Sequence, residues 1–165
     1  YMVPSAVGAA TTVRIGFALG RRQFARARYI AGVSLAMGWA LALLTLTVLV
    51  LFRRTLASFY TGDAAVIAIA ANILLFAAVF QFFDFTQCIA SYALRGYKIT
   101  RAPMSIHGIA FWGLGLLPGY LLAHHAGMGV YGFWAALIAS LAAAAVALVW
   151  YLEKCSRWAQ QHRAL

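Results

Sequence analysis

One carboxylate lies inside the long apolar stretches of this sequence, Asp84, within the segment Phe80–Gln87. A carboxylate at membrane depth is costly, so it normally has a partner or takes part in moving ions or protons. Arg95 follows eleven residues later. On a helix that spacing is roughly 16 Å, close to half of the ~30 Å hydrocarbon thickness. If Arg95 marks the interface, we expect Asp84 near the middle of the membrane.

Polar side chains share the helix face on which Asp84 is expected, because they recur at spacings of three, four and seven residues. Such a stripe must face protein or water rather than lipid. We interpret Asp84 as the acceptor of a proton or of Na⁺. Gln81, Gln87 and Ser91 would then line the path of that ion. The alternative is a buried carboxylate paired with Arg14 or with a basic residue outside this chain. The whole stripe is Phe80, Gln81, Asp84, Gln87, Cys88 and Ser91.

Two further residues are candidates for contact with a substrate. Phe80 adjoins the Asp84 face and could make a cation–π contact with an organic cation. Asp63 precedes the same apolar segment, where a helix N-cap, at Thr61 or Asp63, is the simpler interpretation.

The histidines and motifs give no support for an enzyme or a metal site. His124 and His125 are adjacent, which is weak support for a metal ligand pair, and a solvated loop is the simpler interpretation. His107 is interpreted as an interfacial or packing residue. We find no Ser/His/Asp, Cys/His or Gly-rich phosphate motif, and we expect no enzyme activity and no cofactor.

Composition indicates an integral membrane protein. The 165 residues are 65% hydrophobic and 10% charged, and the mean hydropathy is +0.86; a soluble domain is nearer half apolar and a quarter charged. A net charge of +10 could indicate nucleic acid in a soluble protein. Here the basic residues occupy short loops between apolar spans, which the positive-inside rule explains better. No nucleic-acid partner is expected.

Five membrane-spanning helices are predicted, so the expected fold is an all-α polytopic bundle. Small residues recur every four positions on three of them, including Gly8 to Gly20 and Gly32 to Ala40, which would let neighbouring helices approach closely. The segment Gly113–Gly119 contains Pro118 and should kink or loosen its helix. The spans are about 1–19, 29–52, 64–94, 103–122 and 130–152, followed by a basic tail at 153–165.

Loop charge predicts the orientation. If each span crosses once, ten basic residues fall on one side, in the loops at 20–28 and 95–101 and in the tail, and two on the other, Arg53 and Arg54. The basic side, with the C-terminus, is therefore expected in the cytoplasm. The sequence begins in mid-pattern, and we interpret it as the C-terminal piece of a larger protein.

Three groups of motifs carry a family resemblance. They are Val3–Gly16 continuing to Gly20; Phe80–Asp84 through Ala93–Lys98 and Thr100–Pro103; and Phe111–Gly115 with Pro118–Tyr120. Their order and spacing resemble the C-terminal half of the multidrug and toxic compound extrusion (MATE) family, particularly its NorM-type bacterial members. The resemblance covers essentially the whole chain.

The resemblance implies a twelve-helix transporter of two six-helix lobes in the bacterial inner membrane. This chain would supply part of the C-terminal lobe, and the missing N-terminal lobe would be its partner. Such members exchange cationic, often aromatic, small molecules for H⁺ or Na⁺. Asp84 matches the family's acidic residue implicated in cation coupling, and Asp63 one linked to drug contact. NorM-like members often carry a tyrosine where this chain has Phe80, so a possible Na⁺ ligand is absent.

Two other functions are considered, a lipid-linked glycan flippase of related fold and a non-transporting membrane scaffold. A flippase would be expected to place cations in its central cavity, whereas here the deep residue is acidic. A scaffold gives no reason for Asp84. We favour H⁺ over Na⁺, because Na⁺ needs several oxygen ligands and this face offers few.

Overall fold

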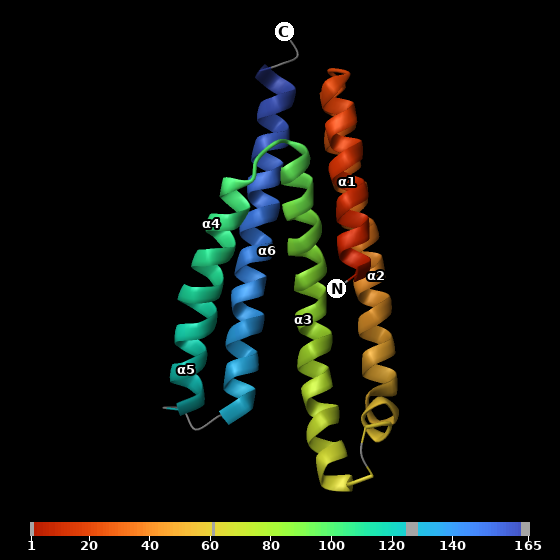
Figure 1. The fold of residues 1–165 in the computed structure, drawn as a ribbon, viewed down its shortest axis with the longest axis vertical. Helices are drawn as coiled ribbons and strands as arrows, with labels where there is room; N and C mark the ends of the chain where they lie inside the picture. Colours follow the sequence, from red (N-terminus) through yellow and green to blue (C-terminus); the bar gives the residue numbers. More distant parts are fainter. Residues whose placement is uncertain (1, 61, 125–128, 163–165) are drawn as a thin grey trace.

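The computed structural model describes residues 2–60, 62–124 and 129–162, without the side chains of 123, 129 and 162. Every regular element in these ranges is a helix (Figure 1), which confirms the predicted all-α fold. Five helical segments of the described chain are long and apolar enough to cross a membrane. The elements are α1 (Met2–Gly20), α2 (Phe24–Ser58), α3 (Ala64–Gly96), α4 (Arg101–Ile109), the π-helix η1 (Ala110–Leu116), α5 (Leu117–His124) and α6 (Gly129–His162).

Three of the helices are much longer than a membrane requires. Helices α2, α3 and α6 have 35, 33 and 34 residues, which corresponds to roughly 50 Å each, whereas the hydrocarbon core is ~30 Å thick. Their ends therefore extend beyond the core or the helices tilt. Helix α2 begins before the span expected at 29–52. Helix α6 continues to His162, so the described residues that we assigned to a tail prolong this helix.

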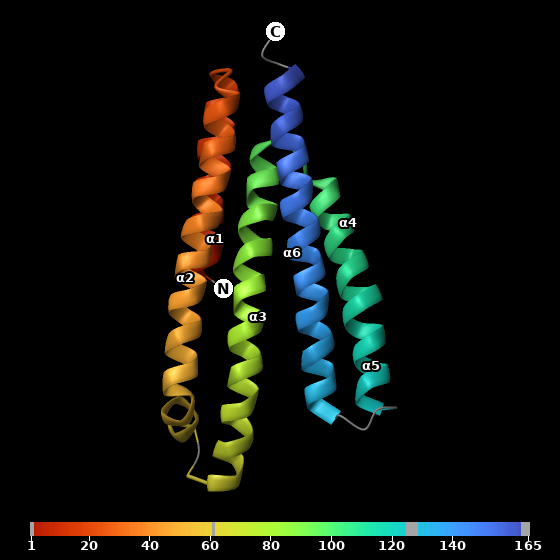
Figure 2. The same cartoon turned by 180° about the vertical axis from the view of Figure 1, so that it is seen from behind.

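Helix α3 occupies the centre of the bundle. It packs against α1 and α2 on one side and against α6 on the other, and η1 and α5 pack against α6. The two opposite views show the same order across the bundle (Figures 1 and 2): α1 and α2, then α3, then α6, then the α4–η1–α5 segment. The main apolar core lies where α1, α2, α3 and α6 meet near the ends of α1 and α3, around Ile15, Leu35, Ile89, Leu94 and Leu148.

Helices α1 and α3 approach closely because glycines face bulky side chains. A Cβ atom at Gly8 would lie 2.5 Å from the Tyr92 ring, and one at Gly96 would lie 2.9 Å from Ile15. The Thr12 hydroxyl donates to the Tyr92 carbonyl at 2.6 Å across the same contact. Gly8 and Thr12, on the small-residue face predicted for the first span, thus lie at an interface, whereas a Cβ at Gly16 would meet nothing within 4 Å.

The small-residue face predicted on α2 does not pack within the described chain. Gly32, Ala36 and Ala40 are exposed, and α2 buries Ala27, Ala31, Ser34, Leu35, Gly38 and Ala42 instead. Small residues occur on more than one side of this helix. Their spacing alone therefore could not indicate which side packs against α3.

The predicted loosening around Pro118 takes the form of the π-helix η1. Proline has no amide N–H, so the carbonyl four residues earlier, that of Leu114, loses its usual donor. Wider turns with i→i+5 bonds are one way to accommodate such a break. A Cβ at Gly115 would lie 3.0 Å from the Ser140 hydroxyl. The glycine therefore lets this widened segment lie close to α6.

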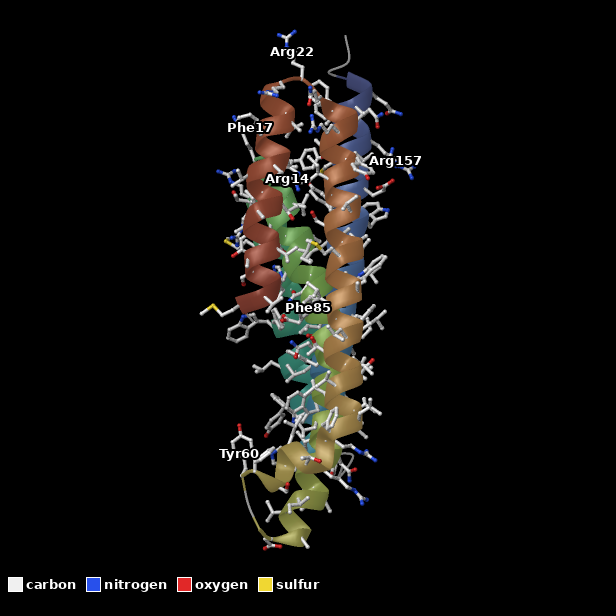
Figure 3. All side chains as sticks on the ribbon, turned by 90° about the vertical axis from the view of Figure 1, so that its right-hand side faces the viewer. Arg14, Phe17, Arg22, Tyr60, Phe85 and Arg157 are labelled. Atoms are coloured by element: carbon white, nitrogen blue, oxygen red, sulfur yellow. The ribbon has the colours of Figure 1, made fainter. Side chains whose placement is uncertain are left out.

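The loops with most basic residues lie at one end of the bundle. Arg22 and Arg157 lie near that end, Tyr60 lies at the other, and Phe85 lies at about mid-height (Figure 3). Asp84, which precedes Phe85 on α3, is thus far from both ends of the bundle. Its position near the middle of the membrane stays a prediction.

We predict that Gly8→Ala destabilises the protein while Gly16→Ala does not. The added methyl at Gly8 must displace the Tyr92 ring, and overpacking of this kind costs about 1–3 kcal/mol. At Gly16 the methyl enters open space and raises helix propensity. Thermal unfolding of the purified full-length variants in detergent measures both effects. Equal unfolding temperatures would contradict the close α1–α3 contact.

Candidate functional site

Asp84 belongs to a chain of three side chains that joins α3 to α4. The Gln87 amide lies between the other two: its Nε2 is 3.0 Å from Asp84 Oδ1, and its Oε1 is 2.6 Å from His107 Nε2. The other ring nitrogen, His107 Nδ1, is 2.7 Å from the Pro103 carbonyl oxygen. Gln87 is buried, and Asp84 and His107 are half-buried.

The local sequence explains how these groups meet. Asp84 and Gln87 are three residues apart on α3, so they lie on the same face. His107 stands four residues after Pro103, which occupies the first turn of α4, where a missing N–H is tolerated. The His107 ring therefore lies over the carbonyl of its own preceding turn. It also stacks on Phe111, one turn further, with ring centroids 6.0 Å apart and planes at 11°.

Asp84 is not paired with Arg14, the intrachain partner considered from the sequence. Among the described residues, the ion pairs are Arg28–Glu153 and Arg157–Glu153, at 2.6 and 2.8 Å. Arg14 is exposed and lines a separate cavity of about 450 Å³ between α1 and α2. The neutral amide of Gln87 is therefore the hydrogen-bond donor to the carboxylate in this part of the protein.

Phe80 lies in an aromatic contact between α3 and α6. Its ring meets Trp134 edge-on, with centroids 6.0 Å apart and planes at 80°. One turn away, Phe76 contacts Tyr131 at 5.7 Å. Phe80 lies one turn from Asp84, and part of its ring is already covered by a neighbour. The sequence did not indicate Trp134 as this neighbour.

The remaining polar residues of the stripe do not join the network. Gln81 is half-buried and forms no hydrogen bond within the described residues. Ser91 is buried and its hydroxyl has no hydrogen-bond partner there.

Thr86, which we had not singled out, accepts a hydrogen bond from Trp39 Nε1 at 3.0 Å and so ties α2 to α3.

Asp63 is the N-cap of α3, as the simpler interpretation had it. Its φ and ψ are −78° and 116°, and its carboxylate accepts from the Ala65 amide at 2.8 Å. The other capping candidate, Thr61, lies outside the described residues. Asp63 is 21 residues from Asp84 on one helix, which places it roughly 31 Å away. The structure therefore does not bring the two carboxylates together.

His107 was expected to pack, and it does stack on Phe111, but its bond to Gln87 was not predicted. It is the histidine within the span predicted at 103–122, where a titratable ring is unusual, and that position was the available signal. Spacing along α3 could not show that a side chain from α4 reaches Gln87. Within the described residues, no cluster of three or more His, Cys, Asp or Glu is arranged to hold a metal ion.

A cavity of about 370 Å³ lies at the basic end of the bundle. It is lined mainly by apolar and aromatic side chains, with Tyr97 and Lys154 among them. Burial raises the pKa of Tyr97 to about 12. This hydroxyl thus stays neutral across the physiological range and cannot exchange a proton there.

Comparison with known proteins identifies the family. The sequence model of the MatE family matches residues 1–121. The chain belongs to the MATE family. It is 66% identical, over its full length, to the probable multidrug resistance protein NorM of Neisseria meningitidis serogroup B. It is 39% identical, again over its full length, to the multidrug resistance protein PmpM of Pseudomonas aeruginosa. The chain spans 36% of the length of each of these relatives.

Solved structures confirm the fold. The crystal structure of the eukaryotic MATE transporter AtDTX14 superposes with a TM-score of 0.85 at 18% identity, covering 99% of this chain and 38% of that one. An inward-facing multidrug resistance MATE transporter gives 0.82 at 18% identity, covering 94% of this chain and 36% of that one. This MATE chain is thus part of a multi-pass membrane protein.

We predict that Gln87→Leu destabilises the protein by about 1–3 kcal/mol, the cost of buried polar groups left without a partner. Leucine fills a similar volume but leaves Asp84 and His107 without their bridge. Gln81→Leu is the matched control, because Gln81 lies on the same helix without a described hydrogen bond. Denaturation of the full-length variants measures the difference. Equal losses for the two variants would contradict the bridging role of Gln87.

Proposed function

We propose that this chain is the C-terminal part of a secondary active multidrug efflux transporter that exchanges cationic organic drugs for H⁺. The observation that carries the proposal is Asp84. It lies at about mid-height of the bundle, bonded to a neutral amide and, among the described residues, in no ion pair. A carboxylate held in this way remains available to a transported cation.

The distribution of charge supports a cationic rather than an anionic substrate. The basic side chains gather at the ends of the helices, and the carboxylate lies between them. In this proposal Phe80 offers an aromatic face one turn from Asp84, Gln81 and Ser91 border the path, and Asp63 meets substrate at the far end of α3. The relatives' names, multidrug resistance proteins, agree with small-molecule substrates.

The surroundings of Asp84 support a proton as the coupling ion. Na⁺ is a hard cation that prefers several oxygen ligands at once. On the described face, the Asp84 carboxylate accepts a hydrogen bond from the Gln87 amide, and this amide is bonded in turn to the His107 ring. Phe80 supplies no oxygen ligand. A proton needs only one acceptor and a connected group to exchange it.

The proposed orientation places the basic end, with the end of α6, in the cytoplasm of a bacterial cell, and the protein in the inner membrane. A further lobe would cover part of the surface that this chain leaves exposed. The outward side of α2, with Gly32, Ala36 and Ala40, is one candidate for that contact, since small residues allow close approach.

We predict that Asp84→Asn abolishes drug efflux by the full-length transporter while membrane insertion is retained. Asparagine removes the charge that the cation requires but keeps the size, and loss of a deep charge eases insertion. Asp84→Glu, which keeps the carboxylate, should retain part of the activity. Drug accumulation in cells expressing each variant at matched levels provides the measurement. Normal resistance with Asp84→Asn would remove Asp84 from the coupling role.

We also predict that an imposed pH gradient drives efflux from proteoliposomes and that an Na⁺ gradient alone does not. The expected response follows from the scarcity of oxygen ligands at Asp84. Fluorescent drug efflux under each gradient, with the other dissipated, separates the two ions. Efflux that follows Na⁺ and ignores pH would show that Na⁺ is the coupling ion.

A further inference from the structure

We propose that the exchangeable proton of this site is carried by His107, while Asp84 stays ionised and Gln87 transmits the charge of one to the other. This inference rests on the proposed function, because it concerns the same exchange of drug for H⁺. It gives the α4 residue of the three-residue chain a role in that exchange. The hydrogen-bond donors and acceptors along the three side chains support it.

The hydrogen-bond partner of Nδ1 determines one proton position on His107. The Pro103 oxygen can only accept, so the nitrogen 2.7 Å from it, Nδ1, must carry a hydrogen. Nε2 then decides the state of the ring. If Nε2 also carries a hydrogen it donates to Gln87 Oε1 and the ring is an imidazolium; if it is bare, the amide must turn and offer its NH₂ group.

The amide links the state of the ring to the state of the carboxylate. With Oε1 toward His107, the NH₂ group donates to an ionised Asp84. With the amide turned, its oxygen faces Asp84, which must then be protonated in order to donate. Each arrangement holds one exchangeable proton, which lies on His107 in the first and on Asp84 in the second. Without that proton, the carboxylate and the bare ring nitrogen are two acceptors competing for one NH₂ group, and one of the two bonds is lost.

Two observations favour the arrangement with the proton on His107. The 2.6 Å separation between Nε2 and Oε1 is shorter than the usual 2.7–3.2 Å of an N–H···O bond, and bonds with a charged donor are shorter than neutral ones. The ring also stacks on Phe111 at 6.0 Å, a distance at which an aromatic face attracts a cation, within about 6 Å. In the proposed arrangement, Asp84 and His107 carry opposite charges on either side of the Gln87 amide.

Other titratable or charged groups described around the network are engaged elsewhere or form no hydrogen bond or ion pair with either end of it. Glu153 on α6 binds Arg28 and Arg157, and Arg95 lies over the Tyr92 ring at 4.7 Å. In the described chain, no hydrogen bond or ion pair joins Asp84 or His107 to any of the remaining groups on the neighbouring elements. These are Arg14 on α1, the tyrosine and arginines of α2, Cys88 on α3, Arg101 on α4, Tyr120 and His124 on α5, and Tyr131, Tyr151, Lys154 and Cys155 on α6.

The exchange step follows with balanced charge. A cationic drug that binds Asp84 takes the place of the imidazolium as counter-charge. His107 then loses the Nε2 proton to water, and the Gln87 amide turns so that its NH₂ group donates to the bare nitrogen. The site holds one negative and one positive charge before and after, and one proton leaves for each cation bound.

The test measures proton release when a full-length transporter in weakly buffered detergent solution binds tetraphenylphosphonium, a permanent cation that has no proton of its own. Linkage requires the wild type to release about one proton per cation bound. His107→Gln should still bind the cation but lose most of the release. His124→Gln, the same change outside the network, should behave as wild type. Full release by His107→Gln with binding intact would overturn the proposal.

A second measurement uses the wild type itself and so does not depend on the folding of a variant. The infrared difference spectrum on cation binding should show an imidazolium becoming a neutral imidazole, with no loss of a protonated carboxyl band. Loss of such a band, absent in Asp84→Asn, would place the proton on Asp84 and overturn the role of His107 alone. Unchanged efflux by Asp84→Asn would instead contradict the proposed function itself.

Discussion

The cost of holding a carboxylate far from water constrains the centre of this structure. Asp84 lies at about mid-height on α3, the helix that contacts α1, α2 and α6. An unpaired charge there would be expensive. A neutral amide that reaches a second titratable ring satisfies the carboxylate partly. The close α1–α3 contact at Gly8 and Gly96 and the Trp39–Thr86 bond hold α3 in the rotation that this bridge requires.

Much of this architecture could be predicted from the sequence, because hydropathy and helix geometry depend on residues that lie close together in the chain. The five apolar helices and the break near Pro118 follow from composition and spacing alone. The N-cap at Asp63 was also predictable, since a capping bond reaches only two residues along the chain. In each case the interacting residues are neighbours in the sequence, so the sequence alone predicts the feature.

Contacts between helices were predicted less well, because they depend on the rotation of each helix about its axis. Gly32 and its neighbours on α2 are exposed in the described chain, and small residues on another side of that helix pack instead. His107 was interpreted as a packing residue, because nothing in α4 indicates that Gln87 lies opposite. The Trp134 contact with Phe80 was missed for the same reason. These partners lie between 20 and 54 positions apart in the chain.

The π-helix has a consequence for how the α4–η1–α5 segment could move. A π turn holds a surplus residue relative to an α-helix, and that surplus can be passed along the chain by exchanging one set of backbone bonds for the next. Each one-residue step turns the part that it crosses by about 100° around the helix axis. Because η1 begins three residues after His107, a step toward α5 would turn the residue that it crosses while the histidine stayed opposite Gln87. The side of the segment that faces α6 could therefore change residue by residue without breaking the link between α4 and α3.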